Sequence, residues 1–160
     1  MMGKAKYFTI MDAMKGYWQM PLHTDSKEYT AFITPFGLYQ WKVMPMGLQG
    51  APAAWQKAMD SLFSSLLFQC FLMYIDDGLV YSNTFEEHLV HLDKILSLAQ
   101  EAKLSLLKSK CKFGYTELKL LGYMVGKDGF KMDQAKIERI VSWPKPSNVS
   151  ELRTFYGLIQ

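Results

Sequence analysis

The stretch CFLMYIDDGLVY, residues 70–81, places two adjacent carboxylates between two apolar runs. Runs this rich in aromatic and β-branched residues favour buried strands. Asp tolerates turn conformations and Gly78 tolerates a positive φ, so the stretch predicts a β-hairpin with Asp76 and Asp77 at its tip. On the hairpin alone, a structural turn and a metal site are equally good interpretations. A metal site also requires a further carboxylate from another part of the chain.

The composition is that of one globular domain. The chain has 160 residues, of which 49% are hydrophobic and 21% charged, too few charges for a disordered tail. No apolar run approaches the roughly 20 residues of a membrane span, and the N-terminus lacks a signal-peptide core. Cys70 and Cys111 lie far apart and form no zinc motif, which fits a reducing compartment. We therefore expect an intracellular protein without membrane contact.

The charges are unevenly distributed along the chain. Residues 1–100 carry 7 Lys and Arg against 9 Asp and Glu, whereas residues 101–160 carry 11 against 6. A basic segment beside an acidic one suggests a polyanion held next to a cation site. A solvated lysine-rich surface is an equally good explanation of the charge alone.

The order of predicted elements indicates an α+β fold. Besides the 70–81 hairpin, apolar runs bounded by turn residues predict strands at 7–11, 29–34, 38–43, 104–107 and 118–125. Apolar residues at spacings of three and four, with Pro52 and the capping box at Thr84, predict helices at 51–67, 84–102, 133–142 and 148–160. We expect an antiparallel sheet covered on one face by helices, rather than a doubly wound parallel fold.

A third carboxylate is placed to join the hairpin. Asp12 ends the strand predicted at 7–11, so it meets Asp76 and Asp77 at one sheet edge if the strands are neighbours. Carboxylates suit Mg²⁺ or Mn²⁺, and two such ions about 3.5–4 Å apart can hold both oxygens of a phosphoryl transfer. Gly47 and Gly50, in the loop 44–52, would allow a substrate to approach the backbone.

Five segments, in order, resemble the reverse transcriptase of gypsy-type LTR retrotransposons. They are FTIMDAMKGYWQMPL, FITPFGLYQWKVMPMGLQGAPAAWQ, FLMYIDDGLVYS, LSLLKSKCKFGYTELKLLGYMV and GFKMDQAKIERIVSWPKPSNVSELRTFYGL. The resemblance implies a polymerase palm over residues 1–125, with a finger-proximal hairpin at 28–43. It implies the start of a helical thumb over residues 126–160.

The resemblance assigns catalytic roles to the three carboxylates. Asp12 and Asp76 match the aspartates that bridge two Mg²⁺ ions, with Mn²⁺ as a substitute, and Asp77 matches an accessory ligand. Lys110 matches a lysine proposed to protonate the leaving pyrophosphate. Lys108 and Lys112 lie close enough to take that role instead, and a solvated or phosphate-contacting lysine is an equal alternative for each.

The resemblance also implies a pocket for the deoxynucleoside triphosphate. Tyr17 matches an aromatic that would collide with a 2′-OH, with Gly16 beside it and Ile75 beneath the sugar; a buried sheet aromatic is the alternative for Tyr17. Met46 and Gly47 match a motif that packs on the incoming nucleotide. Met46 departs from the usual Phe or Gln, and it has no amide to hydrogen-bond a 3′-OH.

The nucleic acid would be held by the C-terminal part of the chain. Leu121, Gly122 and Tyr123 resemble a primer grip, the hairpin that holds the 3′ end of a primer. Basic residues would then contact backbone phosphates, namely Lys127, Lys131, Lys136 and Arg139. The expected partners are an RNA template, a DNA or RNA primer and deoxynucleoside triphosphates.

The chain resembles a piece of a larger polyprotein. The family's fingers, connection and RNase H regions are expected outside it, and the pattern of residues 148–160 stops within an amphipathic helix. An inactive homologue that at most binds nucleic acid is the alternative function. Family members work in cytoplasmic virus-like particles, although nuclear or organellar encoding stays open. His88 and His91 are expected on a solvated helix face, because their spacing matches no zinc motif.

Overall fold

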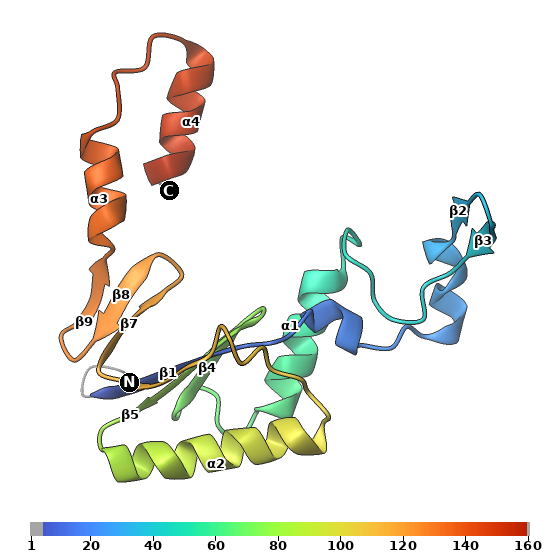
Figure 1. Cartoon of the computed structure of the whole chain (residues 1–160), viewed down its shortest axis with the longest axis horizontal. Coiled ribbons are helices and arrows are strands. Elements are labelled where there is room, and N and C mark those ends of the chain that lie inside the picture. Colours follow the sequence, from blue (N-terminus) through green and yellow to red (C-terminus); the bar gives the residue numbers. More distant parts are fainter. Residues whose placement is uncertain (1–4, 160) are drawn as a thin grey trace.

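The computed structural model, which describes residues 5–159, is built on a four-stranded antiparallel sheet in the order β4-β5-β1-β6 (Figure 1). The strands are β1 (Tyr7–Asp12), β4 (Phe71–Tyr74), β5 (Asp77–Ser82) and β6 (Lys112–Tyr115). The predicted hairpin is confirmed, but its two-residue turn is Ile75–Asp76; Asp77 and Gly78, expected in the turn, pair with Tyr74 and Met73 inside the strands. β1 pairs with β5 along its whole length, and Asp12 stands opposite Asp77.

Two helices cover one face of this sheet, as expected. They are α1 (Ala51–Leu62) and α2 (Phe85–Glu101), which lies along the sheet in Figure 1. The Thr84 side chain accepts a hydrogen bond from the Glu87 N–H, which confirms the predicted N-cap, while the Glu87 carboxylate accepts from the Asn83 N–H instead of the Thr84 N–H of a full capping box. Large side chains are buried beneath both helices, among them Trp55, Met59, Phe63, Phe71 and Ile95. Each such side chain contributes about 1.5–3 kcal/mol to stability through burial.

Two predictions about these helices are wrong. The helix expected over 51–67 ends at Leu62, and the chain then turns, with Phe68 at a φ of 61°. The apolar spacing continues because Leu66 and Leu67 pack on the same core without being helical. His88 is fully buried rather than solvated, because α2 turns it onto Thr9 and Ser82 of the sheet.

A second sheet covers part of the opposite face. Its antiparallel strands are β7 (Glu117–Leu120), β8 (Tyr123–Gly126) and β9 (Gly129–Met132). Leu118 and Val125 pack there on Phe8 and other side chains of the central sheet. The single strand expected over 118–125 is therefore wrong. The chain reverses at Leu121 and Gly122, whose φ values are 47° and 82°.

The strand β6 was not predicted from the sequence. The expected strand at 104–107 contributes only an isolated bridge between Ala13 and Leu106. β6 begins further on, and its pairing with β1 shifts by one residue beside Thr9. Gly114 takes a φ of 69° there, so the strand contains a bulge whose extra residue hides the period of two.

The remaining elements extend away from the central sheet (Figure 1). The hairpin expected within 28–43 is confirmed but is short, with β2 (Phe32–Thr34) and β3 (Gly37–Tyr39). Short 3-10 helices span Gly16–Gln19, Thr24–Ser26 and Glu28–Thr30. At the other extreme lie α3 (Gln134–Val141) and α4 (Val149–Ile159), close to their predicted bounds. Within residues 5–159, no helix combines the length and apolar character required to cross a bilayer.

Candidate functional site

Three carboxylates meet where β1 ends and β5 begins. Asp12 and Asp77 are register partners on adjacent strands. Asp76 lies in the turn directly before Asp77, and its carbonyl accepts a hydrogen bond of 3.0 Å from the Ala13 N–H. The backbone therefore brings together the three acidic residues that the sequence singled out. We call Asp12, Asp76 and Asp77 the carboxylate edge.

The carboxylate edge concentrates negative charge in a partly buried place. Burial raises the pKa of Asp76, and the charges of Asp12 and Asp77 raise it further. Burial and Asp12 likewise raise the pKa of Asp77, while Lys110 opposes both shifts. Within the described residues, the buried Oδ1 atom of Asp76 has no hydrogen-bond partner. These are the properties of a site that a cation would stabilise.

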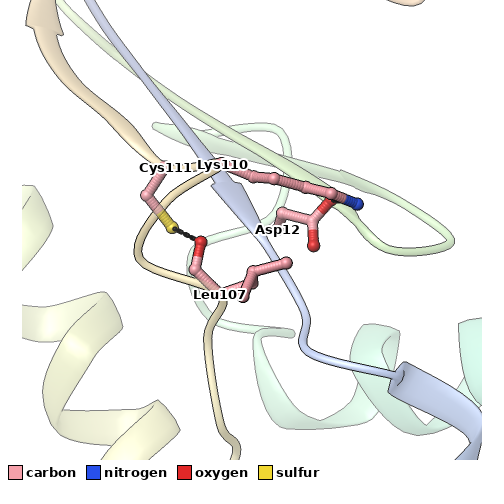
Figure 2. Close-up of polar contacts among 4 residues, drawn as sticks. All are labelled: Asp12, Leu107, Lys110 and Cys111. Carbon is pink, nitrogen blue, oxygen red and sulfur yellow. Dashed lines mark hydrogen bonds and ion pairs between the residues drawn. The ribbon is translucent and has the colours of Figure 1, made fainter.

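Lys110 is the cation that faces this edge. Its Nζ atom lies 3.1 Å from Oδ2 of Asp12 (Figure 2). The turn that carries Lys110 is fixed to β1, because the Leu107 N–H donates a 2.9 Å hydrogen bond to the Asp12 carbonyl. The Leu107 carbonyl in turn accepts hydrogen bonds from the Lys110 N–H and from the Cys111 thiol. Of the three lysines considered from sequence, only Lys110 is paired with Asp12.

A cavity of about 200 Å³ joins the carboxylate edge to the β7–β8 turn. It is lined by Ile10, Asp12, Asp77, Lys110, Lys112, Lys119, Leu120 and Leu121. Leu121, expected in a primer grip, therefore lies at the same cavity as two of the three carboxylates. A larger cavity of about 460 Å³ lies between Lys6 and the β8–β9 turn; Lys127 and Lys131, expected to contact backbone phosphates, line it, but no residue of the carboxylate edge does.

Gly16 lies directly against the carboxylate edge. A Cβ atom at this position would overlap Oδ1 of Asp76 and lie 2.9 Å from the Trp55 ring. Glycine is therefore required by space. The Tyr17 ring packs edge-on against Trp55, with 6.4 Å between the ring centroids. Tyr17 is thus packed on the core yet half exposed, so its position fits both the pocket role and the structural alternative.

Four expected residues are not brought to the carboxylate edge. Met46 is 64% exposed in the loop before α1, where Gly47 has a φ of 92°. The Gly122 carbonyl accepts a hydrogen bond from the Asp133 N–H, and Tyr123 packs edge-on against Phe130. None of the four lines the cavity at the carboxylates.

Two residues of α1 hold the carboxylate turn and were missed from sequence. Ile75 has a φ of 53°, which is rare for a β-branched residue. Gln56 Oε1 accepts a 2.8 Å hydrogen bond from the Ile75 N–H, and its Nε2 donates to the Met73 carbonyl. Trp55 Nε1 donates to the Ile75 carbonyl at 2.8 Å. The sequence signal for these two residues was Ile75 in the turn, because a β-branched residue in a strained turn conformation requires support from other side chains.

The residue chemistry fits divalent cations. Across residues 5–159, no three His, Cys, Asp or Glu side chains already stand in metal-binding geometry. The donors present are nevertheless carboxylate oxygens, which Mg²⁺ and Mn²⁺ prefer. One of them is buried without a partner, and two have raised pKa values. Binding a cation would give the buried Asp76 oxygen a partner and would offset the repulsion between the carboxylates.

Comparisons with known proteins agree with this arrangement. A family model described as "Reverse transcriptase (RNA-dependent DNA polymerase)" matches residues 1–125. The Pol polyproteins from the transposons 297 and gypsy of Drosophila melanogaster are 38% and 32% identical over 98% of the chain. The chain spans 15% of either polyprotein.

Solved structures of reverse transcriptases are also similar to this chain. The foamy viral protease–reverse transcriptase in complex with an RNA/DNA hybrid matches 96% of the chain and 21% of that protein, with a TM-score of 0.85 and 25% identity. A form in complex with double-stranded DNA reaches a TM-score of 0.89 at 25% identity, over 97% of the chain and 27% of that protein. Reverse transcriptases generally use divalent metal ions. The chain therefore belongs to the reverse transcriptase (RNA-dependent DNA polymerase) family.

Proposed function

We propose that this chain is the catalytic palm of an RNA-directed DNA polymerase, part of a retrotransposon polyprotein. The observation that carries the proposal is the carboxylate edge, where Asp12 and Asp77 are register partners and Asp76 adjoins them. Its substrates would be an RNA template, a primer and deoxynucleoside triphosphates. The named complexes of the structural neighbours, with an RNA/DNA hybrid and with double-stranded DNA, support nucleic acid as the ligand.

The carboxylate edge would hold the metal ions. Asp12 and Asp76 would bind them, with Asp77 as an accessory ligand. Two Mg²⁺ ions would supply charge stabilisation to the phosphoryl oxygens during nucleotidyl transfer. In that reaction the primer 3′-hydroxyl would lose its proton to solvent as its oxygen bonds to the α-phosphorus, and the bond between the α-phosphorus and the oxygen bridging to the β-phosphate would break to release pyrophosphate.

The neighbouring residues would position the reactants. Lys110 lies on the cavity with its ammonium 3.1 Å from Asp12, so it can reach a leaving group bound at this edge and donate a proton to it. Tyr17, Gly16 and Ile75 would border the nucleotide pocket, with Met46 and Gly47 on the loop that covers it. Leu121 would contact the primer because it lines the same cavity, and Gly122 and Tyr123, which follow it without lining the cavity, would complete the primer grip.

The test is primer extension on an RNA template with Mg²⁺. It uses the longest polypeptide encoded around this chain, because the relatives' polyproteins are far longer. Asp76→Asn should reduce incorporation by at least about a hundredfold, since one charge of the ion site is lost. Asp25→Asn is the matched control, because that carboxylate is 86% exposed and lies outside the carboxylate edge. Activity that survives Asp76→Asn would refute the assignment.

The second candidate function is an inactive homologue that binds nucleic acid. The excess of basic residues in the C-terminal third favours it, since this excess does not depend on catalysis. A wild-type protein that incorporates no nucleotide but binds an RNA/DNA hybrid with a steep salt dependence would establish this alternative.

A further inference from the structure

A buried hydrogen-bond chain lies behind the catalytic sheet. His88 of α2 is fully buried, and both of its ring nitrogens have hydroxyl partners. Nε2 lies 2.7 Å from Oγ1 of Thr9 on β1, and Nδ1 lies 2.9 Å from Oγ of Ser82 on β5. Thr9 Oγ1 also accepts a 3.0 Å hydrogen bond from the Gly114 N–H of β6. Four separate elements are therefore joined at one place.

The contact with Gly114 lies where β6 changes register. Phe8 pairs with Tyr115, but Ile10 pairs with Lys112, so β6 carries one extra residue opposite Thr9. A bulge of this kind leaves a backbone N–H without a ladder partner. The Thr9 hydroxyl accepts that hydrogen, and Thr9 is itself fully buried. The hydroxyl thus fixes where the bulge forms.

The protons of the chain can be arranged so that every group is satisfied. Thr9 accepts from Gly114 and donates its hydroxyl hydrogen to Nε2 of His88. The Nδ1–H of His88 then donates to Ser82, whose hydroxyl donates to Nδ1 of His91, 2.8 Å away. Burial lowers the pKa of His88, and His91 lowers it further, so the neutral ring required here is favoured. With a charged ring, Nε2 would become a donor and the Thr9 hydroxyl hydrogen would lose its acceptor.

The register of β6 determines the position of Lys110. The turn that carries Lys110 leads directly into β6, and Leu107 joins that turn to the Asp12 carbonyl. If β6 moves by one residue, its side chains exchange faces and the turn shifts along β1. Lys110 would then move away from Asp12. Thr9 lies only three residues before Asp12 on the same strand, so a change of register at Thr9 acts over a short distance on the contact between Lys110 and Asp12.

We propose that Thr9, supported by the Nε2 acceptor of neutral His88, is a positioning residue that fixes the β6 bulge and thereby holds Lys110 at the carboxylate edge. The functional part rests on the proposed polymerase activity. Thr9 touches no substrate and acts only through the bulge. The threonine hydroxyl is the group that matters, rather than its shape or its strand propensity.

The first test measures amide hydrogen exchange in this chain. Thr9→Val keeps the shape and removes the hydroxyl, whereas Thr9→Ser keeps the hydroxyl and is the matched control. We expect Thr9→Val to lower the protection of the Gly114 and Leu107 amides by about tenfold, as a lost hydrogen bond predicts, and to leave Val80 unchanged. Thr9→Ser should preserve all three. Equal losses at Val80 would show a merely structural role and overturn the proposal.

A second measurement uses the wild-type chain alone, so it does not depend on whether a variant folds. The NMR chemical shifts of the His88 ring nitrogens in the wild-type chain should show a neutral ring with its proton on Nδ1. A proton on Nε2 would leave the Thr9 hydroxyl without its acceptor and would contradict the proposed support.

The third test links Thr9 to Lys110 in primer extension. If Thr9 acts through Lys110, Thr9→Val should lower the rate at saturating nucleotide, and Thr9→Val combined with Lys110→Gln should lose no more than Lys110→Gln alone. If the rate losses of the two single variants multiplied in the double variant, the proposed action of Thr9 through Lys110 would be overturned. A wild-type protein without any incorporation would count against the polymerase proposal instead, and the exchange and ring measurements would still decide the role of Thr9.

Discussion

Two hairpin turns lie close to the cavity at the carboxylate edge, and they keep their conformations by different means. The β4–β5 turn carries Ile75 at a φ of 53°, and the β7–β8 turn carries Leu121 at a φ of 47°. Both residues are L-amino acids in the left-handed region, which costs each of them about 1–2 kcal/mol.

The support for the two turns differs. The Ile75 N–H donates a hydrogen bond to Gln56, and the Ile75 carbonyl accepts one from Trp55; both partners belong to a helix anchored in the core. Leu121 is 53% exposed and is followed by Gly122, which adopts its φ of 82° without steric cost. The carboxylate turn is thus held by two core side chains, whereas the turn expected to contact the primer has one outside hydrogen bond, from the Asp133 N–H to the Gly122 carbonyl at 3.4 Å. A turn that must place charges accurately receives support from the core of the domain.

The largest effect should come from removing that support. Gln56→Leu leaves the Ile75 N–H and the Met73 carbonyl without their partner, so we expect a loss of about 2 kcal/mol in the free energy of unfolding. Denaturant titration measures this loss. Gln100→Leu, on an exposed position of α2, should change stability by less than about 0.5 kcal/mol. Equal effects of both variants would show that the hydrogen bonds of Gln56 do not support the turn.

A comparable effect is expected from crowding the same turn. Gly16→Ala would place a methyl group on the Asp76 carboxylate and the Trp55 ring, at a cost of about 1–3 kcal/mol. Gly50→Ala is the matched control, since nothing lies within 4 Å of its added Cβ. Thermal unfolding of both variants measures the difference. If Gly16→Ala were as stable as the control, the close approach of Asp76 to Gly16 would be wrong.

The charge of the carboxylate turn gives a pH-dependent prediction. The folded state raises the pKa of Asp76 and Asp77, so it binds more protons than the unfolded chain at intermediate pH. Stability therefore falls as pH rises through these raised pKa values, and the penalty is complete above them.

Asp76→Asn removes part of this penalty. With a chelator present, it should raise the melting temperature by about 2–4 °C at pH 7 while abolishing incorporation. The gain should vanish below about pH 4, where the wild-type carboxylates are protonated. A variant that is less stable than wild type at pH 7 would disprove the charge penalty.

The smallest effect should appear at the β7–β8 turn, which receives less outside support. Leu121→Asn places a residue that tolerates the left-handed region, so we expect a gain of about 0.5 kcal/mol. Gly122→Ala is the reciprocal change, and it should cost about 1 kcal/mol because φ is 82°. Denaturant titration measures both. If Leu121→Asn were destabilising, contacts of Leu121 would have to stabilise this turn.

Local patterns predicted the parts of the fold that depend on local forces. The hairpin at 70–81 and the cap at Thr84 were correct, because turn residues and capping side chains act within a few positions. The strand β6 was missed because the bulge at Gly114 interrupts its alternation. The apolar pattern missed the Leu121–Gly122 reversal because the flanking residues form one apolar run, whereas the resemblance to a primer grip implied a hairpin there.

The site divides in a similar way. Asp12 could be connected with Asp76 and Asp77 by assuming adjacent strands, and the structure places them together. The burial of His88 could not be predicted, because its partners Thr9 and Ser82 are polar residues on strands that α2 only meets after folding. Polar side chains that pair with one another inside a core leave no hydrophobic period in the sequence.

Because Lys110 is paired with Asp12, this lysine competes with any metal ion that binds the carboxylate edge. A divalent ion that binds Oδ2 of Asp12 competes with an ammonium that is already 3.1 Å from that atom. Because this ammonium is tethered to the chain, its local concentration cannot be diluted by the solution. The displaced side chain is released into the cavity that Asp77 and Leu121 also line. Loading the edge with a cation and presenting a proton donor to the bound substrate would then be a single event.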